Sequence, residues 1–292
     1  MTNDRQSILL IGASGSGKTH YGIQLLGRMQ HCSDSALTTD GSVEDLTLFA
    51  EGLRALEGGR SAEHTASKTH DTLKLSLRTR RGVQTQLLWP EYAGEQIRDI
   101  LNTRKVNAPW LARLQESSRW MLFIRPTQLR PIGRDLKDII VRLESNPESK
   151  PSVAKDDTPP WQLWDDNAKL VELLQILLHS SRHFSLNRLH VPRLAVVISC
   201  WDELSEEQQS HRPAEILGQF LPLVSRFVEA NWESDSRSVW GLSALGRALH
   251  KDSQDEEFAL NGPETAGHVI NPAGEKNIDL TLPVHWLMDG AV

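Results

Sequence analysis

Short apolar runs alternate with polar stretches along the chain in the pattern of an α/β protein. Three runs, at 8–11, 120–124 and 194–198, are continuous and apolar, which is typical of strands buried on both faces of a parallel sheet. A shorter run at 239–242 predicts a last strand. Apolar residues that recur every three or four positions predict helices from residue 18 onwards and over 46–56, 97–101, 170–177 and 216–227.

A β-hairpin is predicted between residues 73 and 89. Leucines alternate with polar residues over 73–77, Arg81-Gly82 can turn the chain, and 83–89 runs back. We expect the first strand to be an antiparallel edge strand with one solvated face, and Pro90 to end the second. Together the elements predict an α/β fold with a mainly parallel sheet, one antiparallel edge strand and helices on both faces.

The chain has 292 residues, enough for one large α/β domain or two small ones. No internal repeat and no convincing linker divides it, so we predict a single domain over 1–292. Polar stretches predict long surface insertions near 33–71, 144–160 and 250–276.

Composition excludes several classes of protein. The net charge of -6 argues against a general nucleic-acid binder, which would have a basic surplus. Cys32 and Cys200 are too few for a disulfide framework or a four-cysteine zinc site, and they fit a reducing compartment. No signal peptide is evident, and no stretch approaches the ~20 apolar residues of a membrane span. The expected location is the cytoplasm.

A glycine-rich loop follows the first predicted strand and has the spacing Gly12-x4-Gly17-Lys18-Thr19. This spacing is the complete P-loop pattern, and it lies between a strand and a helix, as the motif requires. Its backbone N–H groups and the helix N-terminus would bind phosphate oxygens, Lys18 would reach the β- and γ-phosphates, and the Thr19 hydroxyl would ligate Mg²⁺. The nucleotide-binding residues predicted here are Gly12, Ser14, Gly15, Ser16, Gly17, Lys18 and Thr19. The loop therefore predicts binding of a nucleoside triphosphate.

Three further motifs each follow a predicted strand. They are Glu91-Tyr92-Ala93-Gly94-Glu95, Ser199-Cys200-Trp201-Asp202 and Ser243-Ala244-Leu245. In an open α/β sheet, ligands bind beyond the carboxyl ends of the strands, where all four motifs fall. Each motif is weak alone, but their order and spacing are informative.

In this order the motifs resemble those of GTPases of the translation-factor and Ras-like class, over roughly residues 7–247. The resemblance implies a P-loop NTPase with a Ras-like sheet, whose substrate and product are GTP and GDP. It implies that Glu91, in place of the usual Asp of Asp-x-x-Gly, holds Mg²⁺, and that the Gly94 N–H senses the γ-phosphate.

The same resemblance assigns the guanine site. Ser199 and Asp202 stand at the ends of an Asn/Thr-Lys-x-Asp motif, whose carboxylate accepts two hydrogen bonds from guanine. Cys200 replaces the lysine that packs over the base, and one hypothesis is that Trp201 compensates by packing there. Ser243, Ala244 and Leu245 resemble the Ser-Ala-Lys/Leu element, in which a backbone N–H binds the guanine carbonyl.

More narrowly, the chain resembles the bacterial double-GTPases of the TRAFAC clade. The stretch Trp-Pro-Glu-Tyr-Ala-Gly-Glu at 89–95, the Ser-x-Trp-Asp element and the long insertions carry this resemblance. It implies a partner protein, either a second GTPase or a GTPase-associated protein, or self-association. It also implies a role in bacterial signalling or defence.

The catalytic residues predicted are Lys18, Glu95 and Thr65. Glu95 stands where Ras-like proteins have a water-orienting glutamine, and its charge would oppose the γ-phosphate, so we expect slow intrinsic hydrolysis that a partner raises. A helix-capping role for Glu95 is an equal alternative.

The first switch needs a threonine for Mg²⁺ and the γ-phosphate. Thr65 is preferred over Thr69, although either would also suit an ordinary loop. The predicted metal ligands are thus Thr19, Glu91 and Thr65.

Two other functions stay open. An ATPase of the motor or AAA kind would use 196–203 as a Walker B strand with Glu203 as the catalytic carboxylate. Three residues separate Ile198 from Asp202, however, and a metal-binding Asp normally ends the apolar run. A nucleotide-binding assembly module with little turnover would account for Glu95 and Cys200.

Overall fold

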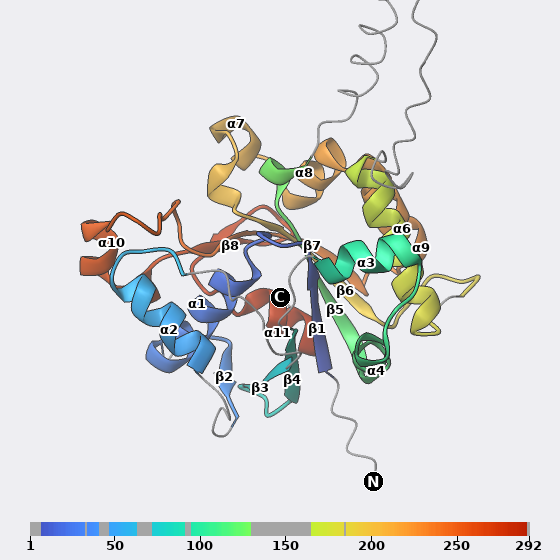
Figure 1. The fold of residues 1–292 in the computed structure, drawn as a ribbon, viewed down its shortest axis with the longest axis horizontal. Helices are drawn as coiled ribbons and strands as arrows, with labels where there is room; N and C mark the ends of the chain where they lie inside the picture. The colour runs from blue at the N-terminus through green and yellow to red at the C-terminus, as the bar shows by residue number, and fades with distance from the viewer. Residues whose placement is uncertain are drawn as a thin grey trace, which may run out of the picture.

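The computed structural model describes residues 7–32, 34–40, 47–62, 72–90, 95–129, 165–183 and 185–290. In that part of the chain one sheet contains nine strands, in the order β2-β3-β4-β1-β5-β6-β7-β8-β9 (Figure 1). The strands are β1 (Ser7–Gly12), β2 (Leu37–Thr39), β3 (Thr72–Thr79), β4 (Gln84–Pro90), β5 (Ser117–Ile124), β6 (Arg193–Ser199), β7 (Arg237–Ser243), β8 (His268–Ile270) and β9 (Lys276–Asn277). The five central strands, from β4 to β7, are parallel.

Helices cover both faces of the sheet (Figure 1). One face carries α1 (Lys18–His31), α2 (Thr47–Glu57), α10 (Glu256–Asn261) and α11 (Leu282–Asp289). The other carries α3 (Glu95–Thr103), α4 (Ala108–Glu116), α6 (Asp166–Ser180), α8 (Pro213–Phe220) and α9 (Pro222–Asn231). The remaining elements are α7 (Glu206–Gln209) and the short turns η1 (Pro126–Gln128), η3 (Trp201–Glu203) and η4 (Pro263–Thr265).

The apolar run at the start of the chain shows why the middle positions of the central strands are apolar. Successive side chains of a strand point to opposite faces. Leu9 and Ile11 pack under α3, α4 and α6, whereas Ile8 and Leu10 pack under α1 and α11. Both faces are covered, so every position must be apolar. The predicted α/β fold with a mainly parallel sheet and helices on both faces is confirmed.

The sheet extends further at both edges than the sequence predicted. β3 is antiparallel to β4 as expected, but β2 pairs with its other side, so β3 is not the edge strand. At the opposite edge β8 is antiparallel to β7, and β9 to β8. The stretches 33–71 and 250–276, expected to be surface insertions, thus contribute strands to the sheet. These strands have only three, three and two residues, too few to show an alternating pattern.

The helix predicted over 216–227 is two helices. Leu221 leaves the helical conformation, with φ -136° and ψ 64°, and Pro222 opens α9. Proline lacks the N–H that would continue the ladder, and its ring clashes with the preceding turn. The apolar spacing runs through this break because both helices pack on the same face of the sheet.

The helix α4 was not predicted. Asn107 caps it by accepting a hydrogen bond from the Trp110 N–H at 3.0 Å, and a proline stands in its first turn. Only Trp110 and Leu114 are buried, so the apolar period is too short to be recognised. Among the helices of the described residues, none combines the length and apolar character needed to cross a lipid bilayer. The insertion predicted at 144–160 lies outside the described residues.

Candidate functional site

The loop between β1 and α1 has a backbone that its glycines make possible. Gly15 and Gly17 have φ of +74° and +80°, a region that other residues rarely adopt. At Gly12 an added Cβ would lie 2.8 Å from Ser16 Oγ and 3.0 Å from Phe123 Cβ, so the loop can pass this close to β5 only with glycine. Ser14 at the loop tip is exposed. The loop therefore has the conformation that presents backbone N–H groups to an anion.

Lys18 begins α1 and folds back over the loop. Its ammonium donates to the carbonyls of Gly12 at 2.9 Å and Ala13 at 2.7 Å, and to Ser16 Oγ at 3.0 Å. The residue is 9% exposed, and burial lowers the pKa of its ammonium to about 8. The cation is thus held at the loop by neutral oxygens, which an incoming phosphate would outcompete.

A pH dependence of nucleotide affinity follows from this pKa of about 8. Phosphate favours the charged ammonium, so the complex keeps the proton to a higher pH than the free protein does. Below about pH 8 the free lysine is already charged, and affinity for GDP should vary little, since phosphate groups ionise near pH 6. As pH rises further, affinity should fall by up to about tenfold per pH unit, because binding then takes up a proton.

Equilibrium titration of a fluorescent GDP analogue between about pH 7 and pH 9 measures this dependence. Lys18→Arg provides the control, because a guanidinium stays charged throughout that range. Whatever affinity the variant retains should not fall with pH. A wild-type affinity that is flat across the whole range would contradict the expectation.

Thr19 offers a hydroxyl oxygen in the first turn of α1, where the residue is partly buried. Mg²⁺ prefers oxygen ligands and is usually held by one or two side chains, waters and substrate phosphates. A hydroxyl beside a phosphate loop fits that chemistry. Among the described residues, no group of three or more His, Cys, Asp or Glu side chains could hold a metal ion. The other predicted ligands, Glu91 and Thr65, lie outside the described residues.

The segment after β6 lies against the phosphate loop. Ser199 is buried, and its Oγ donates to the carbonyl of Ile124 on the neighbouring strand at 3.1 Å. A Cβ placed on Gly17 would lie 3.6 Å from Ser199 Cβ and 3.7 Å from Cys200 Sγ. Burial raises the pKa of the Cys200 thiol to about 12, so it stays neutral. The structure therefore brings two of the sequence motifs into contact.

The hypothesis that Trp201 packs over a bound base is wrong. The residue is 1% exposed, and its indole packs in the core beneath the sheet edge. Its ring carbons lie 2.6 and 2.8 Å from the Cβ position of Gly241 on β7. Trp201 thus holds the segment after β6 in place by packing in the hydrophobic core.

Asp202 and Ser243 join the two motifs of the predicted guanine site. Ser243 Oγ donates a short hydrogen bond to the Asp202 carboxylate and accepts one from the Gly246 N–H at 3.0 Å. Ala244 and Leu245 follow, both partly exposed. The carboxylate is thereby held at the carboxyl edge of the sheet, two residues after Cys200, which contacts the phosphate loop.

The strand β8, which the sequence did not predict, lies beside this site. A Cβ on Gly267 would lie 2.3 Å from the Ala244 carbonyl, so the chain passes directly against the Ser-Ala-Leu motif. His268, paired with Ser243 across the sheet, is half-buried. Burial, with a smaller effect of Lys276, lowers the pKa of His268 to about 4, so its imidazole is neutral.

A further polar group, Arg125, was missed by the sequence analysis. It directly follows β5, and its guanidinium bonds both the Gly15 carbonyl and the Glu203 carboxylate. The signal in the sequence was the position of Arg125 directly after a buried strand, where ligands bind in sheets of this kind. The pairing also bears on the ATPase alternative, because Glu203 is bound to Arg125 and Thr127 rather than poised as a catalytic base.

The switch residues are only partly placed. Glu91 and Gly94 lie outside the described residues, as do Thr65 and its alternative Thr69. Glu95 is the first residue of α3. The preceding strand β4 is parallel to β1, and Leu88 pairs with Leu9. The carboxyl ends of the two strands therefore lie side by side, and the phosphate loop follows β1.

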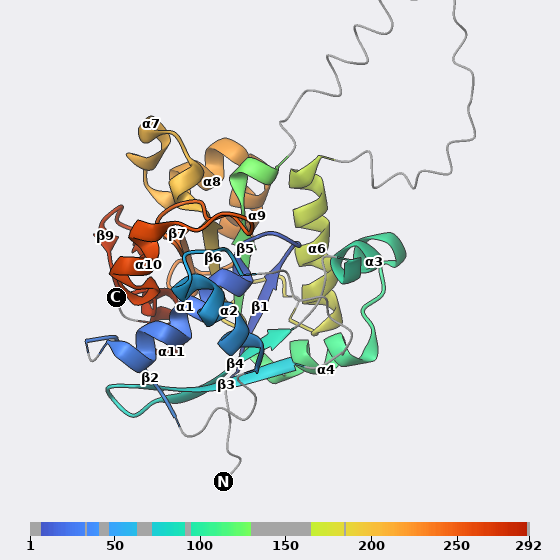
Figure 2. The same cartoon turned by 60° about the vertical axis from the view of Figure 1, so that its left-hand side comes forward.

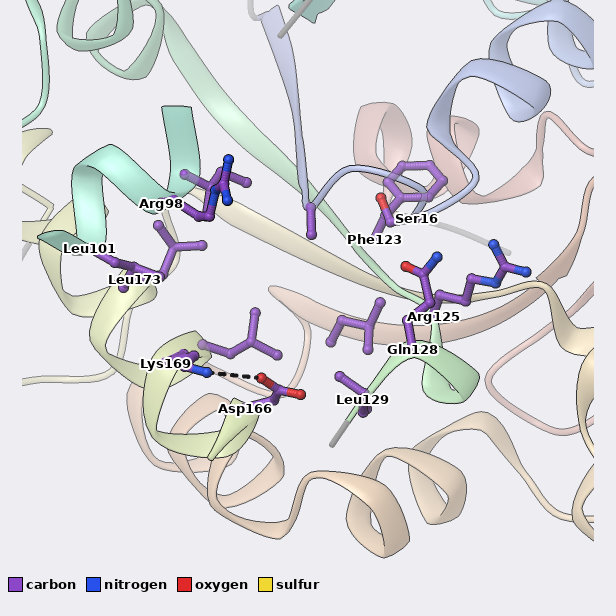
Figure 3. Close-up of a pocket in the computed structure, with 14 residues that line it drawn as sticks. Ser16, Arg98, Leu101, Phe123, Arg125, Gln128, Leu129, Asp166, Lys169 and Leu173 are labelled. Carbon is purple, nitrogen blue, oxygen red and sulfur yellow. Dashed lines mark ion pairs between the residues drawn. The ribbon is translucent and has the colours of Figure 1, made fainter. Parts of the chain in front are cut away.

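A cavity of about 430 Å³ adjoins the phosphate loop on the side of α3 and α6. These two helices lie side by side (Figure 2). Figure 3 shows Arg98 and Leu101 of α3 with Lys169 and Leu173 of α6 on one side, and Ser16 on the other. The lining is largely apolar, and Lys169 pairs with Asp166 at 3.6 Å.

Solved structures share a distant likeness with the chain. A bacterial selenocysteine-specific elongation factor EF-Sec matches with 14% identity and a TM-score of 0.35; the match covers 82% of this chain and 26% of that protein. A probable GTP-binding protein engB matches with 12% identity and a TM-score of 0.31, covering 82% and 88%. The signal recognition particle receptor SRb-GTP/SRX complex from Chaetomium thermophilum matches with 13% identity and a TM-score of 0.36, covering 88% and 97%.

No curated protein sequence is significantly similar to the chain. A family profile described as Double-GTPase 1 matches residues 9–287. That range begins in β1 and ends in α11, so it includes the phosphate loop, the Asp202 segment and the short edge strands β2, β8 and β9. The chain therefore belongs to the Double-GTPase 1 family.

Proposed function

We propose that the protein binds GTP and hydrolyses it to GDP and phosphate, as a molecular switch regulated by a partner. One observation carries the proposal: Asp202, held by Ser243 at the end of β7, lies on the segment after β6 whose residues Ser199 and Cys200 contact the phosphate loop at Gly17. A carboxylate suited to recognising a base therefore lies on the same segment as two residues that contact the proposed phosphate-binding loop. Membership of the Double-GTPase 1 family supports guanine as the base.

In the proposed site, the backbone of the phosphate loop and Lys18 bind the β- and γ-phosphates. Lys18 needs only to exchange its contacts with the Gly12 and Ala13 carbonyls for phosphate oxygens. Thr19, Glu91 and Thr65 would hold Mg²⁺, which neutralises developing charge on the phosphates when bound. The Gly94 N–H would sense the γ-phosphate.

The guanine base would bind at Asp202. An ionised carboxylate accepts the N1–H and the exocyclic amino N–H of guanine, and adenine offers no such pair of donors. Ser243 holds the carboxylate in place, and an N–H of the Ala244–Leu245 segment would donate to the guanine carbonyl. Ser199 supports the segment from β6 through its bond to Ile124.

Intrinsic hydrolysis is expected to be slow. Glu95 can accept a hydrogen bond from the attacking water, but its negative charge opposes the γ-phosphate. A second GTPase, a GTPase-associated protein or another copy of this chain would then raise the rate. We infer a role in bacterial signalling or defence from the family alone.

Asp202→Asn tests the choice of base. The amide replaces one acceptor by a donor, so GTP affinity should fall by about tenfold or more, since hydrogen bonds to charged groups contribute about 1.5–3 kcal/mol each. Xanthosine triphosphate has a carbonyl where guanine has its amino group, so its affinity should rise. Titration of the protein with GTP, ATP and xanthosine triphosphate measures both changes.

Asp235→Asn is the matched control, because Asp235 is exposed and precedes β7 at the opposite end of the sheet. It should bind all three nucleotides as the wild type does. Equal binding of ATP and GTP by the wild type, unchanged by Asp202→Asn, would refute the guanine assignment. Release of phosphate over many turnovers, with and without candidate partners, then separates a GTPase from an assembly module, which would bind GTP tightly without turnover.

A further inference from the structure

Arg125 occupies a central place at the carboxyl edge of the sheet. It follows β5, which lies between β1, the strand of the phosphate loop, and β6, the strand of the base segment. Its Nη1 donates to the Gly15 carbonyl at 3.1 Å. Its Nε donates to Glu203 Oε2 at 2.9 Å, and its Nη2 bonds Glu203 Oε1. One guanidinium therefore contacts both segments of the proposed nucleotide site.

Thr127 and Gln128, which follow Arg125 in the chain, support the contacts of its guanidinium. Thr127 Oγ1 donates to the Glu203 carboxylate, so Glu203 is bound from two positions. Gln128 lies over Gly15, where an added Cβ would come within 2.6 Å of Gln128 Nε2. Figure 3 shows Arg125 and Gln128 close together near Ser16. The Arg125 and Glu203 side chains are 29% and 22% exposed, which shelters the pair from full solvent screening.

The contact with Gly15 acts on the peptide that carries the Ser16 N–H. A carbonyl that accepts a charged hydrogen bond polarises its peptide, which makes the N–H of that peptide a stronger donor. N–H groups at this place in a P-loop cradle the α- and β-phosphates. The other two bonds of the planar fork engage both oxygens of Glu203, the residue after Asp202, and the single nitrogen of a lysine cannot reproduce this two-point contact while also reaching Gly15.

We propose that Arg125 is a positioning residue that joins the phosphate loop to the base segment through Glu203, so that both hold the nucleotide as one unit. The identity of the base rests on the proposed function, but the bridge itself rests on the contacts of Arg125. Its effect falls on the α- and β-phosphates, so GDP and GTP should be affected alike.

A double-mutant cycle on nucleotide affinity tests the bridge. Arg125→Gln and Glu203→Gln should each weaken GDP and GTP by about tenfold, a typical effect of losing a charged hydrogen bond. The double variant should also lose about tenfold rather than the hundredfold of independent effects, because both changes break the same bridge. Arg125→Lys should recover only a small part of the loss. Arg226→Gln is the matched control, since Arg226 forms an exposed ion pair with Glu229 on α9 and should bind nucleotide normally.

Amide hydrogen exchange in the nucleotide-free protein gives a second readout that needs no ligand. Breaking the bridge should speed exchange in peptides that cover 12–19 and 199–203 together, while Arg226→Gln changes neither. All variants should unfold within a few degrees of the wild type, because the Arg125–Glu203 pair is partly exposed and such pairs contribute little to global stability.

Multiplicative affinity losses, full recovery in Arg125→Lys, or unchanged exchange over 12–19 would each overturn the bridge. Failure of the proposed function looks different. If the wild type preferred ATP, the guanine assignment would fall, and the same cycle measured with ADP and ATP would still decide the role of Arg125.

Discussion

Lys18→Met is expected to weaken GTP binding by about two to three orders of magnitude at neutral pH. The ammonium makes charge-assisted contacts with two phosphates in this kind of loop, and each such hydrogen bond contributes about 1.5–3 kcal/mol. Its removal also leaves the Gly12 and Ala13 carbonyls, now bonded to Lys18, close to anionic phosphates without a cation between them. Calorimetric or fluorescence titration with GTP measures the loss.

The loss should come without unfolding. Burial lowers the Lys18 pKa to about 8, so folding disfavours the charged ammonium, and an apolar side chain of similar length removes that cost. The thermal midpoint of the nucleotide-free variant should therefore equal or exceed that of the wild type. Lys74→Met, on the exposed side of β3, is the control for loss of a positive charge. GTP affinity within a few-fold of the wild type in Lys18→Met would contradict the assignment of the loop.

Gly241→Ala is expected to lower the free energy of unfolding by about 2–3 kcal/mol, near the upper end of the range for overpacked cores. The new methyl would lie 2.6 Å from a Trp201 ring carbon and 3.0 Å from Ile270 Cβ. Trp201 can move aside only at a cost in packing, because it is 1% exposed and enclosed by the core. Urea denaturation measures the change. A displaced Trp201 moves the turn that carries Asp202, so GTP affinity should fall as well.

Two comparisons make this expectation specific. In a Trp201→Leu background the ring is gone and the contact with Ile270 Cβ at 3.0 Å remains, so Gly241→Ala should cost clearly less than in the wild type. Gly218→Ala is the matched glycine control, because its nearest neighbour is Ser225 Oγ at 4.0 Å and alanine favours the helix α8. A Gly241→Ala protein as stable as Gly218→Ala would show that the indole does not pack as described.

The central part of the fold follows from local patterns in the sequence. The runs that became β1, β5 and β6 are apolar at every position because helices cover both faces, which is typical of buried parallel strands. The phosphate loop was predictable for a different reason: its glycines are required by the backbone conformation itself, at Gly15 and Gly17 by positive φ. A requirement for positive φ at a glycine is a local property of the backbone, so a sequence motif can reveal it.

What the sequence did not predict depends on neighbours in space. The Arg125–Glu203 pair joins residues 78 positions apart, and an arginine after a strand has many possible partners. Trp201, next to an acidic residue in a predicted loop, suggested an exposed ring; only the missing side chain of Gly241 on the adjacent strand leaves room for it in the core. Strands as short as β2, β8 and β9 form because a longer strand offers free backbone groups for pairing.

The helix α11 has a consequence for how the protein is made. Its side chains Val284, Leu287 and Met288 pack in the same cluster as Ile8 and Tyr21, and the Tyr21 hydroxyl donates to the Leu280 carbonyl, 259 residues later. During synthesis the helix that begins with Lys18 therefore leaves the ribosome long before the residues that cover it. The apolar face of α1 therefore stays uncovered until the last part of the chain has been made, and exposed apolar surface of this kind favours aggregation during folding.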